Sequence, residues 1–248
     1  MVEQQISREF GRIESPKDER DFDLFSFIPM KIDSLPKFKK WDFPIDEPLD
    51  QKQTPHCVGF SMAHFGINMP IHAFYNTEDA HNFYFKCKEV DGFPNRDGTT
   101  IRAAATVLRN VGLIEAYAFA RSMATLEYWL LTRGPVIIGV RWTTEMMFPD
   151  ENGIITIGGQ TLGGHAVLVN EKTEDGYFGF KNSWGKNWGL NGKGYIKRED
   201  LAKLLADRGE ALTAVQLEEY KLERDPWLVR IIKNIIKQLT LYFRTQAN

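Results

Sequence analysis

The sequence has very few cysteines. Only Cys57 and Cys87 occur among its 248 residues, which is too few for the disulfide framework that holds small secreted proteins together. Residues 1–10 lack the basic start and apolar run of a secretory signal peptide. The chain also lacks the unbroken apolar run of about 18 residues that a membrane-spanning helix needs. We therefore expect a cytoplasmic protein without disulfide bonds.

An excess of either charge is also missing. Lys and Arg together number 31 and Asp and Glu 33, which leaves a formal net charge of −2. A nucleic-acid-binding protein usually shows a clear basic footprint, so nucleic acid is not an expected partner. Apolar residues make up 43% and charged residues 26% of the chain, as in ordinary globular proteins. The length fits one large domain or two closely packed lobes.

Hydrophobic periodicity divides the chain into two halves. In the first half, apolar residues recur at helical spacing in three segments, residues 57–65, 77–90 and 100–111. In the second half, short β-type runs alternate with Gly, Asn and Asp at residues 135–140, 154–157, 166–169, 177–180 and 194–196. This order predicts an α+β fold with a helical lobe, an antiparallel β lobe, and a site in the cleft between them.

The sequence predicts four segments. They are an extended arm over residues 1–30, a helical lobe over 31–124, a β lobe over 125–212 and a helical extension over 213–248. We expect the polar arm to pack along the protein's own surface or along a neighbour's. Within the extension, residues 225–244 have the pattern of an amphipathic helix. We expect its apolar stripe to dock on the protein's own body or on a second copy rather than on a membrane surface.

Cys57 is the main candidate for chemistry. A lone cysteine is commonly an inert core residue, and we expect this of Cys87. Cys57, however, opens a predicted helix, where unpaired N–H groups and the helix dipole stabilise a thiolate. Gln51 lies six residues upstream and can donate a hydrogen bond from its side-chain amide. The second half adds His165 at the start of a predicted strand, followed by Asn182-Ser183-Trp184-Gly185.

These motifs resemble those of the papain family of cysteine peptidases. That family has a glutamine six residues before the nucleophilic cysteine, a histidine preceded by small residues, and Asn-Ser-Trp-Gly followed by Trp-Gly and Gly-Tyr. The last three motifs stand here at residues 182–185, 188–189 and 194–195, and the resemblance runs from about residue 28 to 205. It implies a papain-like two-lobed fold and hydrolysis of peptide or isopeptide bonds through a thioacyl-enzyme.

The resemblance also implies the role of each site residue. Cys57 would be the nucleophile, His165 the general base and acid, Asn182 the group that orients the imidazole, and Gln51 an oxyanion donor beside the Cys57 N–H. We expect Cys57 to be a reactive thiolate at neutral pH. Trp184 would shield the His–Asn hydrogen bond from water. The expected substrate-binding residues are Gly98, Thr99, Gly164, Ala166 and Trp184.

No metal or other cofactor is expected. The histidines do not fall at a metal-binding spacing, and no Cys-x-x-Cys pair occurs. The Gly163-Gly164 pair lacks the Lys-Ser/Thr of a phosphate loop and is better explained by a substrate that passes close to the backbone beside His165. We expect His56, next to the nucleophile, to be a solvated residue at the rim of the site.

Three departures from the family pattern leave other functions open. Thr54 replaces a disulfide cysteine, Val58 replaces an aromatic residue, and Thr99 replaces the second glycine of a substrate-binding pair. The main expectation is a peptidase that acts on a peptide or protein substrate. One alternative is an acyl-transfer enzyme, a ligase or transpeptidase, that uses the same acyl-enzyme. The other is a catalytically silent binding or structural protein with the same fold.

Overall fold

The computed structural model describes residues 8–19, 21, 23–27, 35–42 and 47–216. Residues up to Gln216 form one compact unit, and residues from Leu217 onward form a second. The predicted amphipathic helix at 225–244, and its docking on the protein's body, a second copy or a membrane, lie outside the described residues.

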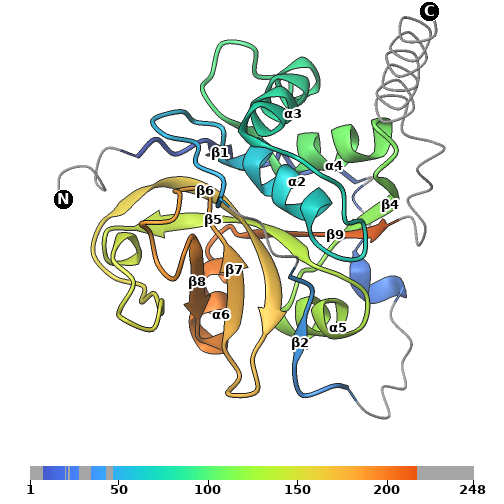
Figure 1. Ribbon diagram of the computed structural model, residues 1–248. Helices are drawn as coiled ribbons and strands as arrows, with labels where there is room; N and C mark the ends of the chain where they lie inside the picture. The colour runs from blue at the N-terminus through green and yellow to red at the C-terminus, as the bar shows by residue number, and fades with distance from the viewer. Residues whose placement is uncertain (1–7, 20, 22, 28–34, 43–46, 217–248) are drawn as a thin grey trace, which may run out of the picture. The chain divides into compact units, whose positions relative to one another are not determined.

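A seven-stranded sheet forms the larger part of the fold (Figure 1). Its strand order is β4-β9-β5-β6-β7-β8, with β2 paired to β6, and the neighbouring strands run antiparallel. The strands are β2 (Lys39–Lys40), β4 (Ile114–Phe119), β5 (Val136–Thr143), β6 (Thr161–Lys172), β7 (Phe178–Lys181), β8 (Lys193–Ile196) and β9 (Glu210–Gln216). The longest strand, β6, lies near the middle of the sheet and contacts both β5 and β7.

Three helices pack together beside this sheet. They are α2 (Cys57–Ile67), α3 (Thr77–Val90) and α4 (Ile101–Asn110), and they agree with the predicted helices to within two residues at each end. Every residue of α2 is buried, because α3 and α4 contact it on one side and β6 on the other. The helix that carries Cys57 is therefore held against the middle of the sheet.

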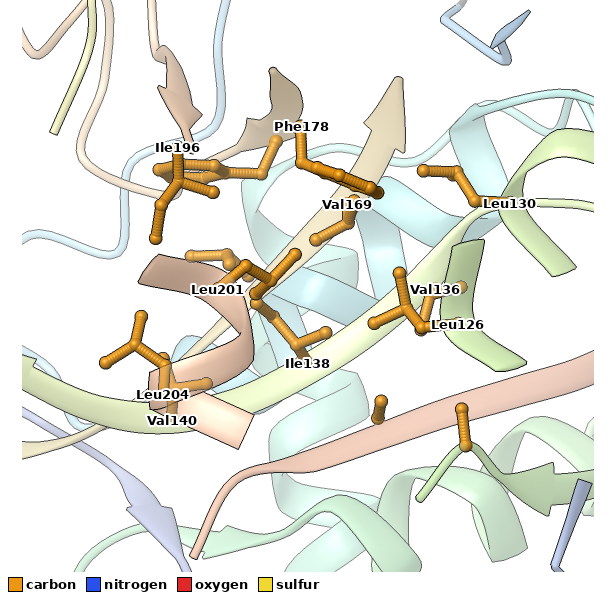
Figure 2. Close-up of a cluster of buried hydrophobic side chains, with 14 of the residues drawn as sticks. Leu126, Leu130, Val136, Ile138, Val140, Val169, Phe178, Ile196, Leu201 and Leu204 are labelled. Atoms are coloured by element: carbon orange, nitrogen blue, oxygen red, sulfur yellow. The ribbon is translucent and has the colours of Figure 1, made fainter. Parts of the chain in front are cut away.

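Two further helices, α5 (Met123–Thr132) and α6 (Arg198–Ala206), were not predicted from the sequence. Both supply leucines to the apolar core of the sheet, where they meet side chains of β5, β6 and β7 (Figure 2). The core residues labelled in the figure are Leu126, Leu130, Val136, Ile138, Val140, Val169, Phe178, Ile196, Leu201 and Leu204. At roughly 1.5–3 kcal/mol for each fully buried large side chain, this cluster is a principal source of stability. Two 3₁₀ turns, η1 (Leu24–Phe27) and η2 (Glu145–Met147), complete the helical elements of the described residues.

Two segment predictions are corrected. The strand predicted at 154–157 is a loop in which Ile154 alone forms a bridge, to Tyr195. Ile154 is held in the turn around Asp150, because the Asp150 side chain accepts the Ile154 N–H at 2.8 Å and the Ile154 carbonyl accepts the Asp150 N–H at 2.9 Å. The helical extension predicted from residue 213 begins inside β9, which ends at Gln216. Burial of this strand between β4 and β5 explains the difference.

The predicted lobe boundary at 124/125 also falls inside an element. Helix α5 spans it, and β4 from the predicted helical lobe joins the large sheet. The other strand predictions are confirmed, although β6 extends well beyond the predicted 166–169 at both ends.

Candidate active site

Cys57, His165 and Asn182 come from three different elements. Cys57 is the first residue of α2, His165 lies within β6, and Asn182 follows the last residue of β7. All three side chains are buried. Contact between α2 and β6 brings them together, and the backbone N–H of Ala166, next to His165, donates a hydrogen bond to the Cys57 sulfur.

A hydrogen bond between His165 and Asn182 determines which ring nitrogen carries the proton. His165 Nε2 lies 2.7 Å from Asn182 Oδ1, and that oxygen also accepts the backbone N–H of Ser183 at 2.8 Å. Because the oxygen is the acceptor, Nε2 is the donor, and Nδ1 of a neutral ring holds the lone pair. Nδ1 is buried and has no hydrogen-bond partner among the described residues. It is thus free to accept a proton.

Aromatic side chains enclose the His165 ring. Trp184 stacks on it at 4.7 Å between ring centroids with an interplanar angle of 28°, and Trp142 meets it edge-on at 4.9 Å. Trp184 therefore lies where it was expected to shield the His–Asn pair. Burial lowers the pKa of His165 to about 4, although the hydrogen bond that its Nε2 donates to Asn182 acts in the opposite direction. The imidazole is neutral in this state.

Ser183 fixes the orientation of the Gln51 amide. Its hydroxyl donates to Gln51 Oε1 at 2.6 Å, and its carbonyl accepts the Gln51 backbone N–H at 2.8 Å. Gln51 Nε2 must therefore point the other way. It donates to the backbone oxygens of Thr54 at 2.6 Å and Glu9 at 3.1 Å. The predicted oxyanion donor is thus in contact with the N-terminal arm.

Residues 8–15 of the arm lie across the site. The backbone N–H of Gly11 donates to the Cys57 sulfur, and the Gly11 carbonyl accepts the Thr99 N–H at 2.8 Å. The arm continues as β1 (Arg12–Ile13), which pairs in parallel with β3 (Thr99–Thr100). A Cβ atom on Gly11 would stand 1.7 Å from the carbonyl oxygen of Pro55, so only glycine fits at this point.

Side chains anchor the arm on both sides of Gly11. Phe10 packs edge-on against His165 and Trp184, with ring centroids 6.0 and 6.2 Å apart. Arg8 pairs with Asp50 at 2.7 Å and donates to the Trp184 carbonyl at 3.0 Å. On the other side, Arg12 forms a buried ion pair with Glu210. The arm packs on the protein's own surface, one of the two locations expected, and it covers the nucleophile.

The expected thiolate is not the state of Cys57 beneath this arm. Burial raises the pKa of the thiol to about 11, even though the N–H groups of Ala166 and Gly11 lower it. The thiol is therefore protonated at neutral pH while the arm excludes water and the imidazole is neutral. Both cysteines are free, and the Cys87 sulfur packs 3.4 Å from the sulfur of Met62.

The five predicted substrate-binding residues all border the arm or the nucleophile. Thr99 binds the Gly11 carbonyl, and a Cβ on Gly98 would lie 2.3 Å from that same oxygen. A Cβ on Gly164 would lie 2.1 Å from the Arg12 carbonyl oxygen. Ala166 binds the sulfur through its N–H, and the Trp184 carbonyl binds Arg8. The structure thus brings these residues together, and their contact with a substrate stays a prediction.

His56 is not the solvated rim residue that was expected. It is half-buried, stacks on Tyr84 at 3.6 Å between ring centroids, and its Nδ1 lies 2.6 Å from Nδ1 of His81. Burial, followed by the nearby His81, lowers its pKa to about 4. This contact depends on the packing of α3 against α2, which no local pattern around Cys57 could have indicated.

Sequence reasoning missed several residues of the site. The orienting role of Ser183 could have been inferred from its place beside Asn182, and Phe10 stands out as an apolar residue in a polar arm. Trp142 and Glu210 carried no local signal. In the described part of the chain, no three His, Cys, Asp or Glu side chains gather as metal ligands. None of the helices described there is long and apolar enough to cross a membrane.

Comparison with known proteins identifies relatives of this chain. The model of the papain family cysteine proteases matches residues 73–207, more than half of the chain. That stretch includes His165 and Asn182 and begins after Gln51 and Cys57. The chain is also similar to a gut-specific cysteine proteinase of Caenorhabditis elegans, 33% identical over 91 residues. The match covers 35% of this chain and 27% of that protein's length.

Solved structures show the same arrangement of elements. The chain is similar to the crystal structure of xylellain, a cysteine protease from Xylella fastidiosa, with a TM-score of 0.67 and 19% identity over 85% of this chain and 97% of that one. It is also similar to procathepsin B S9 from Trypanosoma congolense, with a TM-score of 0.64 and 14% identity over 88% and 89% of the two chains. At such identities the likeness concerns the fold, and it confirms the expected α+β, papain-like fold.

Proposed function

Because the chain belongs to the papain family of cysteine proteases, we propose that it hydrolyses peptide bonds with Cys57 as the nucleophile and His165 as the general base and acid. One observation carries the proposal. The His165–Asn182 hydrogen bond leaves the Nδ1 lone pair without a partner among the described residues, and the N–H of the next residue, Ala166, donates to the sulfur of Cys57, which opens a buried helix. A base with this tautomer can take the thiol proton.

Acylation then follows from these positions. Nδ1 of His165 takes the Cys57 proton as the sulfur forms a bond to the substrate carbonyl carbon. The carbonyl oxygen becomes an oxyanion, which the Cys57 N–H and Gln51 Nε2 stabilise by hydrogen bonds. When the C–N bond breaks, His165 returns the proton to the leaving amine, and a thioester remains on Cys57. Asn182 keeps the ring oriented through both transfers.

Deacylation uses the same residues with water as the nucleophile. His165 takes a proton from water, the hydroxide forms a bond to the thioester carbonyl, and the C–S bond breaks. The sulfur leaves as a thiolate that regains the proton. An amine in place of this water would give acyl transfer, so the choice between hydrolysis and transfer depends on what reaches the thioester.

The arm must leave the site before a substrate enters. Gln51 Nε2, the Thr99 N–H and the Cys57 sulfur are all bound to arm backbone, and these are the groups that a substrate needs. In the arm-covered state the protein cannot turn over. The free cysteines support the further proposal that the protein works in a reducing compartment such as the cytoplasm.

The test uses an alkylating probe and peptide turnover. Iodoacetamide labelling of the full chain, with mass mapping, identifies the reactive cysteine, and a mixed fluorogenic peptide library reports hydrolysis. We expect label on Cys57 and turnover that is lost in Cys57→Ala. Product analysis with added hydroxylamine separates acyl transfer from hydrolysis. Labelling of Cys87 in preference to Cys57, or turnover that survives Cys57→Ala, contradicts the proposal.

A further inference from the structure

The ammonium group of Lys88 gathers the loop that leads to Thr99. Lys88 lies in the last turn of α3, and its Nζ donates to Oδ2 of Asp91 at 2.8 Å. It also donates to three backbone carbonyls of the loop, those of Phe93 at 2.6 Å, Arg96 at 2.9 Å and Gly98 at 3.0 Å. One cation therefore binds four oxygens along residues 91–98.

The loop depends on this ammonium group for its hydrogen bonds. The side chain of Lys88 is 16% exposed and that of Asp91 is fully buried. Carbonyl and carboxylate oxygens that are buried without a donor cost free energy, and the loop lies outside the helices and strands whose ladders would supply one. An ammonium group has three N–H donors, so it serves several of these oxygens at once. Without it, the loop has to open to water.

Gly98 is held at both of its backbone polar groups. Its N–H donates to the hydroxyl of Tyr84 at 3.2 Å, and its carbonyl accepts from Lys88. Tyr84 and Lys88 stand four residues apart on α3, so they share one face of the helix. Gly98 has a φ of 86°, a left-handed conformation that glycine adopts without strain. One turn of α3 thus fixes the peptide groups on both sides of Gly98.

The peptide group after Gly98 carries the N–H that the site presents to a bound chain. This is the N–H of Thr99, which donates to the Gly11 carbonyl of the arm at 2.8 Å. The Gly98 carbonyl and the Thr99 N–H belong to one peptide group, so Lys88 binds one end of it and the arm binds the other. Because a peptide group is planar, a fixed carbonyl also fixes the direction of the N–H.

Tyr84 links this peptide group to the nucleophile. Its ring stacks on His56, the residue before Cys57, at 3.6 Å between ring centroids. Helix α3 contacts both α2, which begins at Cys57, and β3, which begins at Thr99. The position of the Thr99 N–H relative to the sulfur is therefore set through α3.

From these contacts we infer that Lys88 and Tyr84 are positioning residues, which direct the Thr99 N–H toward the backbone of a bound substrate. The inference rests on the proposed peptidase function and adds two residues to it. Both side chains act through Gly98 rather than on the reacting atoms. Their loss should therefore weaken substrate binding and leave the chemical step of a bound substrate intact.

Lys88→Met tests the inference in the full chain that carries Gly11→Ala, whose added Cβ overlaps Pro55 and displaces the arm. Methionine keeps a flexible apolar stem and removes the ammonium group. We expect KM for a fluorogenic peptide to rise about 2- to 10-fold, the range for one neutral hydrogen bond, while kcat and the rate of Cys57 labelling by iodoacetamide stay the same. An unchanged KM, or a fall in kcat alone, overturns the inference.

Lys203→Met is the matched control. Lys203 forms an ion pair of the same length, 2.8 Å, and of the same three-residue spacing with Asp200, but its side chain is 70% exposed, so KM should not change. Tyr84→Phe is a second variant should Lys88→Met not fold. It removes only the hydroxyl that binds Gly98 and should also raise KM. A KM equal to that of the Gly11→Ala chain would contradict the role of Tyr84.

Chemical rescue distinguishes positioning from a general loss of stability. Lys88→Ala lacks the atoms from Cγ to Nζ, and propylammonium supplies the same atoms as a free ion. Propylammonium should lower the KM of Lys88→Ala. Tetramethylammonium, which has the same charge but no N–H donor, should not lower it. The same KM in the presence of either ion contradicts the inference.

A protection measurement separates this inference from the proposed function, because it needs no turnover. A synthetic peptide of residues 8–15 is titrated into the Gly11→Ala chain until labelling of Cys57 is half suppressed. Lys88→Met should raise this half-suppressing concentration by the same factor as one lost hydrogen bond, about 2- to 10-fold. Such a shift supports the inference even if no peptide is hydrolysed. An unchanged concentration contradicts it, whatever the result of the turnover assay.

Discussion

Substitution of Gly11 by alanine is expected to expose the nucleophile. The added Cβ would stand 1.7 Å from the Pro55 carbonyl oxygen and 2.8 Å from its Cα. Both atoms belong to the backbone, so no rotamer change relieves the overlap, and the arm must move away from the helix that carries Cys57. Movement at Gly11 also breaks its hydrogen bond with Thr99. We expect Cys57 to become accessible to water and to small electrophiles.

The size of the effect follows from the thiolate fraction. Beneath the arm the pKa of Cys57 is about 11, so at pH 7.5 only about 1 thiol in 3,000 is ionised. At an ordinary thiol pKa of about 8.5, roughly a tenth is ionised, which is about 300 times more. Pairing with the His165 imidazolium and the N-terminus of α2 lowers the pKa further. The rate of alkylation should therefore rise by about 100-fold or more.

The assay is iodoacetamide labelling followed by intact mass and peptide mapping, for wild type and Gly11→Ala at the same pH. Gly176→Ala is the control, because it adds the same methyl group where nothing lies within 4 Å of it. Cys87 is an internal control for unfolding, since it is buried and its sulfur packs against Met62. A synthetic peptide of residues 8–15 should slow labelling again. Equal Cys57 labelling rates in Gly11→Ala and wild type would refute the reasoning.

Three further outcomes follow from the buried groups. In the Gly11→Ala background, His165→Ala should slow Cys57 labelling by about 10-fold or more, because it removes the base and the imidazolium; unchanged labelling contradicts the assigned role. The thermal midpoint should be the same with and without a strong reductant, since both cysteines are free; a midpoint that falls on reduction would reveal a disulfide. Burial lowers the pKa of His64 to about 3 and that of His165 to about 4. Their stabilisation is therefore present above the unfolded pKa of about 6.5 and lost as the pH falls toward the folded values. Urea midpoints should fall between pH 7 and 4, and less steeply in His64→Gln; equal slopes would show that His64 is not the cause.

The helices beside the nucleophile were predictable because their signals are local. Pro55 precedes α2 and Gly66 lies one residue before its end, and α3 begins after Asn76, whose side chain caps the helix in a reciprocal pair with Asp79. The apolar residues of α3 recur at helical spacing and form one buried face, so the helical period is easily recognised in the sequence. Such signals need no knowledge of the rest of the fold.

Helices α5 and α6 and strands β4 and β9 were missed for a physical reason. In α5, tryptophan and leucines are buried together with Thr125 and Met123, so the segment shows no single apolar stripe. Strand β9 is recognisable only by its neighbours β4 and β5. Pairing across a sheet joins residues that are far apart in the sequence, and a pattern within one segment cannot report it.

A few motif residues predicted the site, but the sequence did not predict that the N-terminal arm covers it. Cys57, His165, Asn182 and Gln51 stand in recognisable local surroundings, which is why they could be singled out. Contacts of the arm depend on residues 40 to 200 positions away, such as Gly11 with Pro55 and Arg12 with Glu210. A polar stretch with one or two aromatic residues gives no indication of where it docks. The protonation state of Cys57 was therefore also beyond prediction.

The number of protons that Cys57 and His165 hold together determines whether release of the arm depends on pH through these two residues. While the arm covers the site, the thiol of Cys57 keeps its proton and the imidazole of His165 gains none, because the pKa of the thiol is about 11 and that of His165 about 4. In an open site the proton moves to the imidazole, and the pair of thiolate and imidazolium again holds one proton. The two states thus exchange no proton with water across the neutral range, and release of the arm has no pH dependence from this pair. The ion pairs of Arg8 with Asp50 and Arg12 with Glu210, together with Phe10 and the Gly11 hydrogen bonds, hold the arm in place instead. A ligand that competes with Arg12 for Glu210 or with Arg8 for Asp50 therefore acts on the arm directly.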